Sequence, residues 1–345
     1  MTDARGMTAT ITRSQYSYGP AGRTAGWDNH AWDGIAVDDP DVAALPRPRH
    51  QVLPFLKHSW FWLVVAGQAM VLAASYVAAV NESRVLAWLT LPGYIVFMAG
   101  AVLIVNRHIR WGDLPDFAKV LGWGLASGLV AFVIARIIEG GIEPRVMPFS
   151  AELWLAGPVE ETSKLLVPVL LLAFGGLAFK DPRAGLLLVM TSAAFFGVAE
   201  GLFYSINASQ WGILSEGFTR PVSEMGHPYM TGIAAPVIWL AAWRAGRVVT
   251  KAGILAWVAV MALHSVHDGV GGFGKQQQNI TSFSALDGQF WATTAGGTAF
   301  AAVWAVLMYL LTRHTARELA PPAALPDNPA HWRPQMKRWG STSTD

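Results

Sequence analysis

Long runs of mostly apolar residues recur through the middle of this chain and dominate its pattern. A helix needs about 20 such residues to cross roughly 30 Å of hydrocarbon. The runs predict about eight membrane spans, near residues 59–80, 85–105, 117–138, 153–175, 185–206, 226–244, 252–272 and 289–312. The predicted fold is therefore all-α, a polytopic helical membrane protein.

The two ends of the chain lack this pattern. Residues 1–50 are polar with scattered Gly, Pro and Asp, and residues 318–345 are polar and rich in proline, within tails predicted at 1–57 and 314–345. Such segments bury too little apolar surface to offset the entropy lost on ordering. We therefore predict two disordered cytoplasmic tails around one multi-span membrane domain, residues 58–313. No short apolar stretch follows a basic start, so we expect an uncleaved first span rather than a signal peptide.

Composition agrees with a lipid environment. Hydrophobic residues make up 53% of the chain and charged residues 14%, against about 25% charged residues in soluble domains. The Lys and Arg residues behind the net charge of +2 are scattered between the spans, so no nucleic-acid partner is expected. The chain has no cysteine, which excludes disulfides, thiolate metal sites and a cysteine nucleophile.

Basic residues gather in alternate loops between the predicted spans. One set of loops holds Arg47, Arg49, Lys57, Arg107, Arg110, Lys180, Arg183, Arg244, Arg247, Lys251, Arg313 and Arg317. The other loops hold mostly single basic residues: Arg84, Arg145, Arg220 and Lys275. By the positive-inside rule, both termini are expected in the cytoplasm of a protein embedded in the plasma membrane.

Four of the predicted spans carry ionisable residues, namely Glu160, Glu161, Lys164, Glu200, His227, His264 and Asp268. A charge at mid-helix depth costs about 2.5–3.5 kcal/mol on insertion scales, so such residues are usually kept for function and face the protein interior. With a rise of about 1.5 Å per residue, the predicted topology places all of them in the outer half of the membrane. We expect one shared polar cavity that opens to the extracytoplasmic side.

Spacing within the helices adds chemistry. Glu160 and Lys164 are four residues apart in the order that favours an ion pair. Lys164 is expected to neutralise one glutamate and leave the other to act as a general base. His264 and Asp268 share a helix face, where the aspartate would fix the imidazole tautomer, and His267 is a further candidate on part of that face.

The four sets of residues read as EExxK at 160–164, FxxxE at 196–200, HxxxT at 227–231 and HxxxD at 264–268. This ordered series on successive spans resembles the PrsW family of intramembrane proteases, a distant relative of the CAAX-prenyl endopeptidase and bacteriocin-processing group. The resemblance covers roughly residues 115–272. Gly201 departs from it, because such proteins often carry Asn after the motif glutamate.

The resemblance implies regulated proteolysis of a membrane-anchored protein, such as an anti-sigma factor, near its extracytoplasmic side. The catalytic residues expected from it are Glu160, Glu161, Glu200, His227, His264 and Asp268, with Lys164 in support. In this hypothesis Glu160 or Glu161 activates a water molecule and Glu200 helps to position it. The two histidines stabilise the oxyanion or protonate the leaving amine, and Asp268 orients His264.

Alternatives remain at this point. No HExxH helix is present, so a glutamate mechanism without a cofactor is preferred. A zinc ion held by His227, His264 and Glu200 is the alternative mechanism. Other classes are a non-catalytic membrane protein that binds a peptide, as in immunity or scaffolding, and a proton-coupled transporter. The sequence does not specify an oligomeric state.

Overall fold

The computed structural model describes residues 54–319 except 110, 115, 143–148 and 272–279. Within this part, regular structure is helical and no residue forms a strand, which confirms the all-α prediction. The longer helices are α4 (Ser59–Val80), α5 (Thr90–Ile109), α6 (Phe117–Ile137), α8 (Phe149–Phe174), α9 (Pro182–Asn207), α10 (Gly212–Glu224), α11 (Gly226–Ala245), α12 (Lys251–Gly271) and α13 (Gly288–Thr315).

Each of the eight predicted spans overlaps one of these helices. Six helices in the described part of the chain are long and apolar enough to cross a membrane. The two others that match predicted spans are α8 and α11, and they carry several of the ionisable residues singled out above. The protein therefore has several membrane-spanning helices, while the count of eight stays a prediction.

The predicted tails lie mainly outside the described residues. Their described edges are helical, because Pro54–Lys57 and Ala316–Leu319 form short 3-10 helices and α13 continues to Thr315. The domain boundaries at residues 58 and 313 stay predictions.

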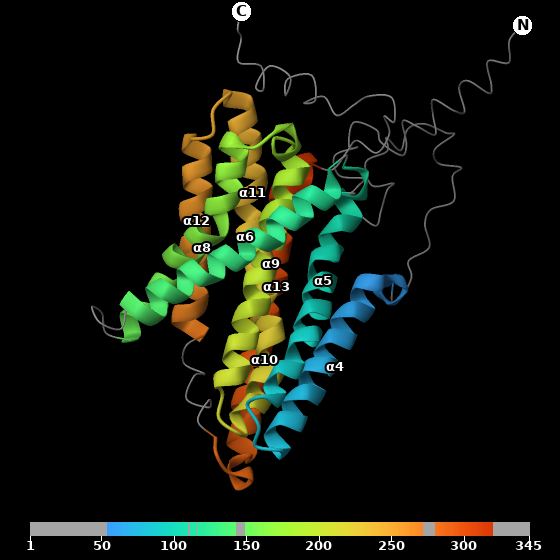
Figure 1. The fold of residues 1–345 in the computed structure, drawn as a ribbon, viewed down its shortest axis with the longest axis vertical. Coiled ribbons are helices and arrows are strands. Elements are labelled where there is room, and N and C mark those ends of the chain that lie inside the picture. The colour runs from blue at the N-terminus through green and yellow to red at the C-terminus, as the bar shows by residue number, and fades with distance from the viewer. Residues whose placement is uncertain (1–53, 110, 115, 143–148, 272–279, 320–345) are drawn as a thin grey trace, which may run out of the picture.

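Helix α9 lies at the centre of the bundle. In Figure 1 it runs between α4 and α5 on one side and α8 and α12 on the other. In its most apolar stretch 83% is buried in the protein, compared with 22–44% for the other five candidate spans. Asp181 caps its start by accepting a hydrogen bond from the Arg183 backbone amide at 2.8 Å, and Pro182 occupies the first turn.

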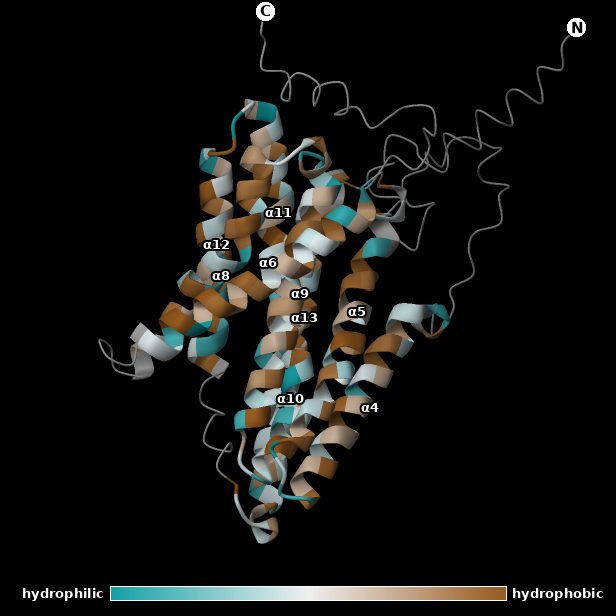
Figure 2. Ribbon diagram, viewed as in Figure 1, coloured by the Kyte–Doolittle hydropathy of each residue, from teal (hydrophilic) through white to brown (hydrophobic). Residues whose placement is uncertain are grey.

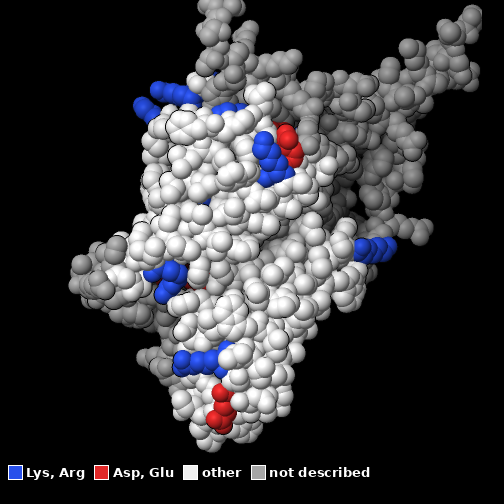
Figure 3. Space-filling view, viewed as in Figure 1, with Lys and Arg blue, Asp and Glu red and all other residues white. Residues whose placement is uncertain are grey.

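The outer helices present apolar surface. Figure 2 shows hydrophobic residues along much of α4 and α5. On the face in Figure 3, charged side chains are few and widely spaced over the described surface. Such a surface suits contact with lipid, because apolar groups there need no water.

Glycines let the helices approach closely around the later spans. A methyl group at Gly157 of α8 would collide with the Met261 carbonyl and with Ser265 of α12. A methyl group at Gly197 of α9 would come within 3.1 Å of the Glu224 carbonyl and 3.2 Å of the His227 ring. Larger residues at either position would push apart the helices that carry the ionisable residues.

Helix α10 was not predicted. The sequence pattern predicts a loop at residues 207–225, which include Arg220, whereas Gly212–Glu224 is a helix in contact with α4, α9 and α13. Its polar residues interrupt the continuous apolar run that marks a span in the sequence. In the structure these residues pair with one another inside the bundle. Because α11 follows directly at Gly226, His227 lies at a junction of two helices.

Candidate active site

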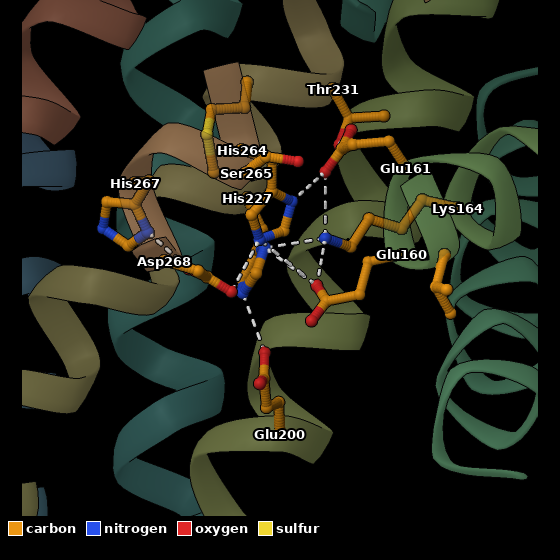
Figure 4. Close-up of polar contacts among 12 residues, drawn as sticks. Glu160, Glu161, Lys164, Glu200, His227, Thr231, His264, Ser265, His267 and Asp268 are labelled. Carbon is orange, nitrogen blue, oxygen red and sulfur yellow. Dashed lines mark hydrogen bonds and ion pairs between the residues drawn. The ribbon is translucent and has the colours of Figure 1, made fainter. Parts of the chain in front are cut away.

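Ionisable side chains from four helices converge at one place in the bundle, as Figure 4 shows. They comprise Glu160, Glu161 and Lys164 of α8, Glu200 of α9, His227 of α11, and His264 and Asp268 of α12. All seven residues expected from the sequence are brought together. The side chain of Asp268 is 26% exposed, whereas those of His264 and Glu161 are 1% and 0% exposed.

Lys164 links both glutamates of its own helix to α11. Its Nζ donates to Glu160 Oε2 at 2.8 Å and to Glu161 Oε1 at 3.1 Å. Lys164 therefore pairs with both glutamates, whereas the sequence predicted that it neutralises only one of them. Nζ also lies 2.7 Å from His227 Nδ1. Because an ammonium group can only donate, this His227 nitrogen accepts and its Nε2 carries the proton.

His227 Nε2 faces two carboxylates. It lies 2.9 Å from Glu200 Oε2 and 2.8 Å from Glu224 Oε2. Glu224 is the last residue of α10, is 1% exposed and was missed by the sequence reasoning. Its position three residues before His227, in an ExxH spacing, was an available signal.

Glu161 orients the second histidine. Its Oε1 lies 2.7 Å from His264 Nδ1, while its Oε2 accepts a hydrogen bond of 2.7 Å from the Thr231 hydroxyl. An ionised carboxylate only accepts, so His264 Nδ1 carries the proton and Nε2 presents a lone pair. The short hydrogen bond that was expected from Asp268 is thus made by Glu161 from a different helix.

Asp268 lies closer to His267 than to His264. Its Oδ1 lies 2.8 Å from His267 Nδ1, and the His267 ring stacks on Phe300 with centroids 5.7 Å apart. Its Oδ2 lies 3.6 Å from His264 Nε2, which is beyond hydrogen-bond distance. Asp268 therefore reaches the site from the more exposed side without fixing the His264 tautomer directly.

The unbonded nitrogen of His264 is suited to bind a metal ion. His264 Nε2 is buried and has no hydrogen-bond partner among the described residues. It lies 3.5 Å from Glu160 Oε2, and that oxygen lies 3.7 Å from His227 Nδ1. Ligand atoms around a tetrahedral zinc ion, at bond lengths near 2.1 Å, are separated by about 3.4 Å.

Charge balance also fits a cation. The carboxylates around the two histidines in the described structure are Glu160, Glu161, Glu200, Glu224 and Asp268. The lysine and arginine side chains that contact them, among the described residues, are Lys164 and Arg220. Buried charges require partners, and a divalent ion would balance this excess of carboxylates.

Two sets of side chains have donor atoms close enough to share an ion. In each set the atoms lie within 4.8 Å of one another: Glu160, His227 and His264 in the first, and Glu200, Glu224 and His227 in the second. In the second set the contacts of 2.8 and 2.9 Å are those of direct pairing. The first set has the wider spacing that metal ligands need and the unbonded nitrogen, so it fits an ion better.

Comparison with known proteins gives one result. A family model described as PrsW family intramembrane metalloprotease matches residues 117–311, which include every residue of the site. No curated protein and no solved structure matches the chain.

Proposed function

The chain belongs to the PrsW family of intramembrane metalloproteases, and from that premise we propose that it cleaves a membrane-anchored protein, such as an anti-sigma factor, near its extracytoplasmic side. Family membership makes it a membrane-embedded peptide hydrolase with a protein substrate in a lipid environment. The observation that carries the proposal is the buried, unbonded His264 Nε2 beside Glu160. Such an arrangement is costly unless it serves a ligand or a reaction.

We propose that Glu160, His227 and His264 hold a divalent metal ion. The family description does not support the preference for a mechanism without a metal, and the donor atoms of these three residues fit an ion. A bound ion of this kind supplies an activated water molecule and polarises the scissile carbonyl. Glu200, the third zinc ligand expected from the sequence, instead supports His227 through Nε2.

The remaining residues prepare this chemistry. Glu161 holds His264 so that Nε2 faces Glu160, and Thr231 fixes the glutamate from its other oxygen. Such supporting contacts orient ligands and restrict their rotamers. Lys164 contacts the same Glu160 oxygen and His227 nitrogen that would bind an ion, so its ammonium group would move aside when the ion binds. Asp268 is the most exposed of the seven residues at 26% of its side chain, so the substrate is proposed to enter past it.

The membrane arrangement belongs to the same proposal. Both termini lie in the cytoplasm of a plasma-membrane protein, as the basic residues of alternate loops indicate. The site then faces the extracytoplasmic side, where a membrane-anchored substrate presents the residues next to its own span. Water reaches a carbonyl there more easily than at the bilayer centre.

New protein N-termini in the membrane fraction test this function. Cells that carry the parent protein are compared with cells that carry Glu160→Gln or His264→Ala. Termini that map just outside a substrate's membrane span are expected in the parent and absent from both variants. His314→Ala, at the exposed end of α13, is the matched control and keeps the parent pattern. Identical termini in all four samples, at equal protein abundance, would contradict proteolysis.

Metal analysis of the purified protein tests the proposed ligands separately. About one equivalent of a divalent metal is expected in the parent and in His314→Ala, with a large loss in His264→Ala and Glu160→Gln. Parent protein that is active and free of metal would contradict the metal assignment but not the protease assignment.

A further inference from the structure

Helix α10 carries a buried polar ladder that the proposed chemistry does not use. Glu216, Arg220 and Glu224 follow one another at intervals of four residues and share a helix face. Arg220 Nε donates to Glu216 Oε2 at 2.8 Å, and its Nη1 donates to Glu224 Oε1 at 3.1 Å. The guanidinium carbon also lies 3.4 Å from the centre of the Tyr204 ring of α9. Arg220 is therefore fixed by three side chains.

Glu224 connects this ladder to the site. One carboxylate oxygen is bound by Arg220, and the other, Oε2, lies 2.8 Å from His227 Nε2. Oε2 is buried, and Glu200 Oε2 lies 2.9 Å from the same nitrogen, so the two carboxylates compete for one N–H group. The single N–H of His227 therefore faces two carboxylates.

Two carboxylates that share a single N–H group need a positive charge nearby. Buried like charges disfavour each other, and an adjacent cation relieves the cost. Arg220 supplies that cation on the side of Glu224, while Lys164 occupies the opposite nitrogen of His227. The acceptors at Nε2 keep the proton on that nitrogen, which leaves Nδ1, the atom that Lys164 contacts, as the nitrogen that would bind an ion.

The position of Glu224 in the chain gives this contact a second effect. Glu224 is the last residue of α10 and His227 is the second residue of α11, so the contact bridges the break at Met225. The orientation of His227 therefore depends on the position of α10 relative to the neighbouring helices. The contact of Arg220 with the Tyr204 ring of α9 helps to fix that position, while Arg220 also binds Glu224 within α10.

We propose that Arg220 and Glu224 are positioning residues of this active site: Arg220 holds Glu224, and Glu224 together with Glu200 holds His227. The inference deepens the proposed function and rests on it, since it gives His227 a part in the cleavage reaction. Neither residue was among those expected from the sequence motifs.

Steady-state cleavage of a reporter substrate by the full-length protein in detergent or nanodiscs tests the proposal. Glu224→Gln and Arg220→Gln are expected to lower kcat by about 10- to 100-fold with little change in KM, as is typical for residues that orient a reactive group. The double variant is expected to lose no more than Arg220→Gln alone, because it removes the buried carboxylate that Arg220 compensates.

Thr219→Val is the matched control. Thr219 precedes Arg220 on α10, and its hydroxyl lies 3.1 Å from the Thr298 hydroxyl of α13. The change removes an interhelical hydrogen bond of α10 without touching the path to His227. A kcat for Glu224→Gln equal to that of Thr219→Val would overturn the proposal.

Two readouts do not depend on proteolysis. The ring ¹⁵N resonance of His227 Nε2, assigned by its loss in His227→Gln, is expected to move in Glu224→Gln and to stay in Thr219→Val. The metal content of Glu224→Gln is expected to equal that of the parent. An unmoved resonance contradicts the contact, and loss of metal would make Glu224 a ligand instead of a positioning residue. A parent without proteolytic activity contradicts the proposed function, while the resonance still decides the inference.

Discussion

Glu161 Oε1 lies 2.7 Å from His264 Nδ1 and thereby joins α8 to α12 in the interior of the bundle. The neighbouring Glu160 points its Oε2 toward the other nitrogen of the same ring, 3.5 Å from Nε2. Successive residues on a helix differ by about 100° in direction, which lets two adjacent glutamates address two atoms of one histidine. The adjacent pair therefore divides into an orienting residue and a candidate ligand.

This division predicts different outcomes for the two glutamates. Glu160→Gln is expected to abolish both cleavage and stoichiometric metal binding, because it removes a ligand. Glu161→Gln is expected to retain metal at a high metal concentration and to lower activity or metal affinity by about 10- to 100-fold, as supporting residues of metal sites do. Metal analysis and peptide cleavage on the same preparations measure both effects. Equal loss of metal in the two variants would contradict the division.

The hydrogen bond of Thr231 can be tested with two substitutions, one that removes the hydroxyl and one that keeps it. Its hydroxyl donates to Glu161 Oε2 at 2.7 Å and is fully buried. Thr231→Val keeps the shape but leaves a buried carboxylate oxygen without this donor, which costs about 1–3 kcal/mol. Reduced thermal stability and slower cleavage are expected, whereas Thr231→Ser keeps both close to the parent. If the serine variant is as impaired as the valine variant, the methyl group and not the hydrogen bond matters at this position.

The sequence was sufficient for the parts of the site that depend on one helix at a time. Apolar runs located long helices, six of which in the described part of the chain are apolar enough to cross a membrane. Residues such as Glu160 and His264 stood out because charges are costly in lipid. Spacing on a helix reveals which residues share a face, but it does not reveal which residue of another helix completes a contact. For that reason Asp268 was expected to fix His264, whereas Glu161 makes the short bond.

Helix α10 was missed for a related reason. Its polar residues are satisfied by one another and by Tyr204, as the Arg220 contacts show. A segment whose charges pair internally looks hydrophilic in sequence, and Pro221 adds a loop signal. Glu224 was lost with that segment, although it lies as close to His227 as the expected Glu200 does.

Gly197 tests how closely α9 must approach the helix junction. An added methyl group would meet Met98 Cε at 2.9 Å, the Glu224 carbonyl at 3.1 Å and His227 Cδ2 at 3.2 Å. Gly197→Ala is expected to lower stability by about 1–3 kcal/mol through overpacking and to slow cleavage by displacing His227. Gly122→Ala is the control, because nothing lies within 4 Å of the added methyl group. Thermal unfolding and cleavage assays compare the two, and parent-like cleavage by Gly197→Ala would show that the junction tolerates displacement.

Lys164 gives the prediction that links stability to metal binding. Its side chain is fully buried, and its ammonium group contacts Glu160, Glu161 and His227. Removing one partner of a buried ion pair leaves uncompensated charge and costs about 3–5 kcal/mol. Lys164→Met is therefore expected to unfold at a clearly lower temperature than the parent.

The exposed Lys119, whose Nζ lies 5.5 Å from the centre of the Phe179 ring, provides the control Lys119→Met, for which little change is expected. The ammonium group of Lys164 contacts two of the three proposed metal donors, so it competes with an ion for Glu160 and His227. Added zinc should therefore raise the unfolding temperature of Lys164→Met more than that of the parent, because the ion replaces the missing positive charge. Thermal unfolding with and without zinc measures this difference. An equal response of Lys164→Met and Lys119→Met would contradict both the buried ion pair and the competition.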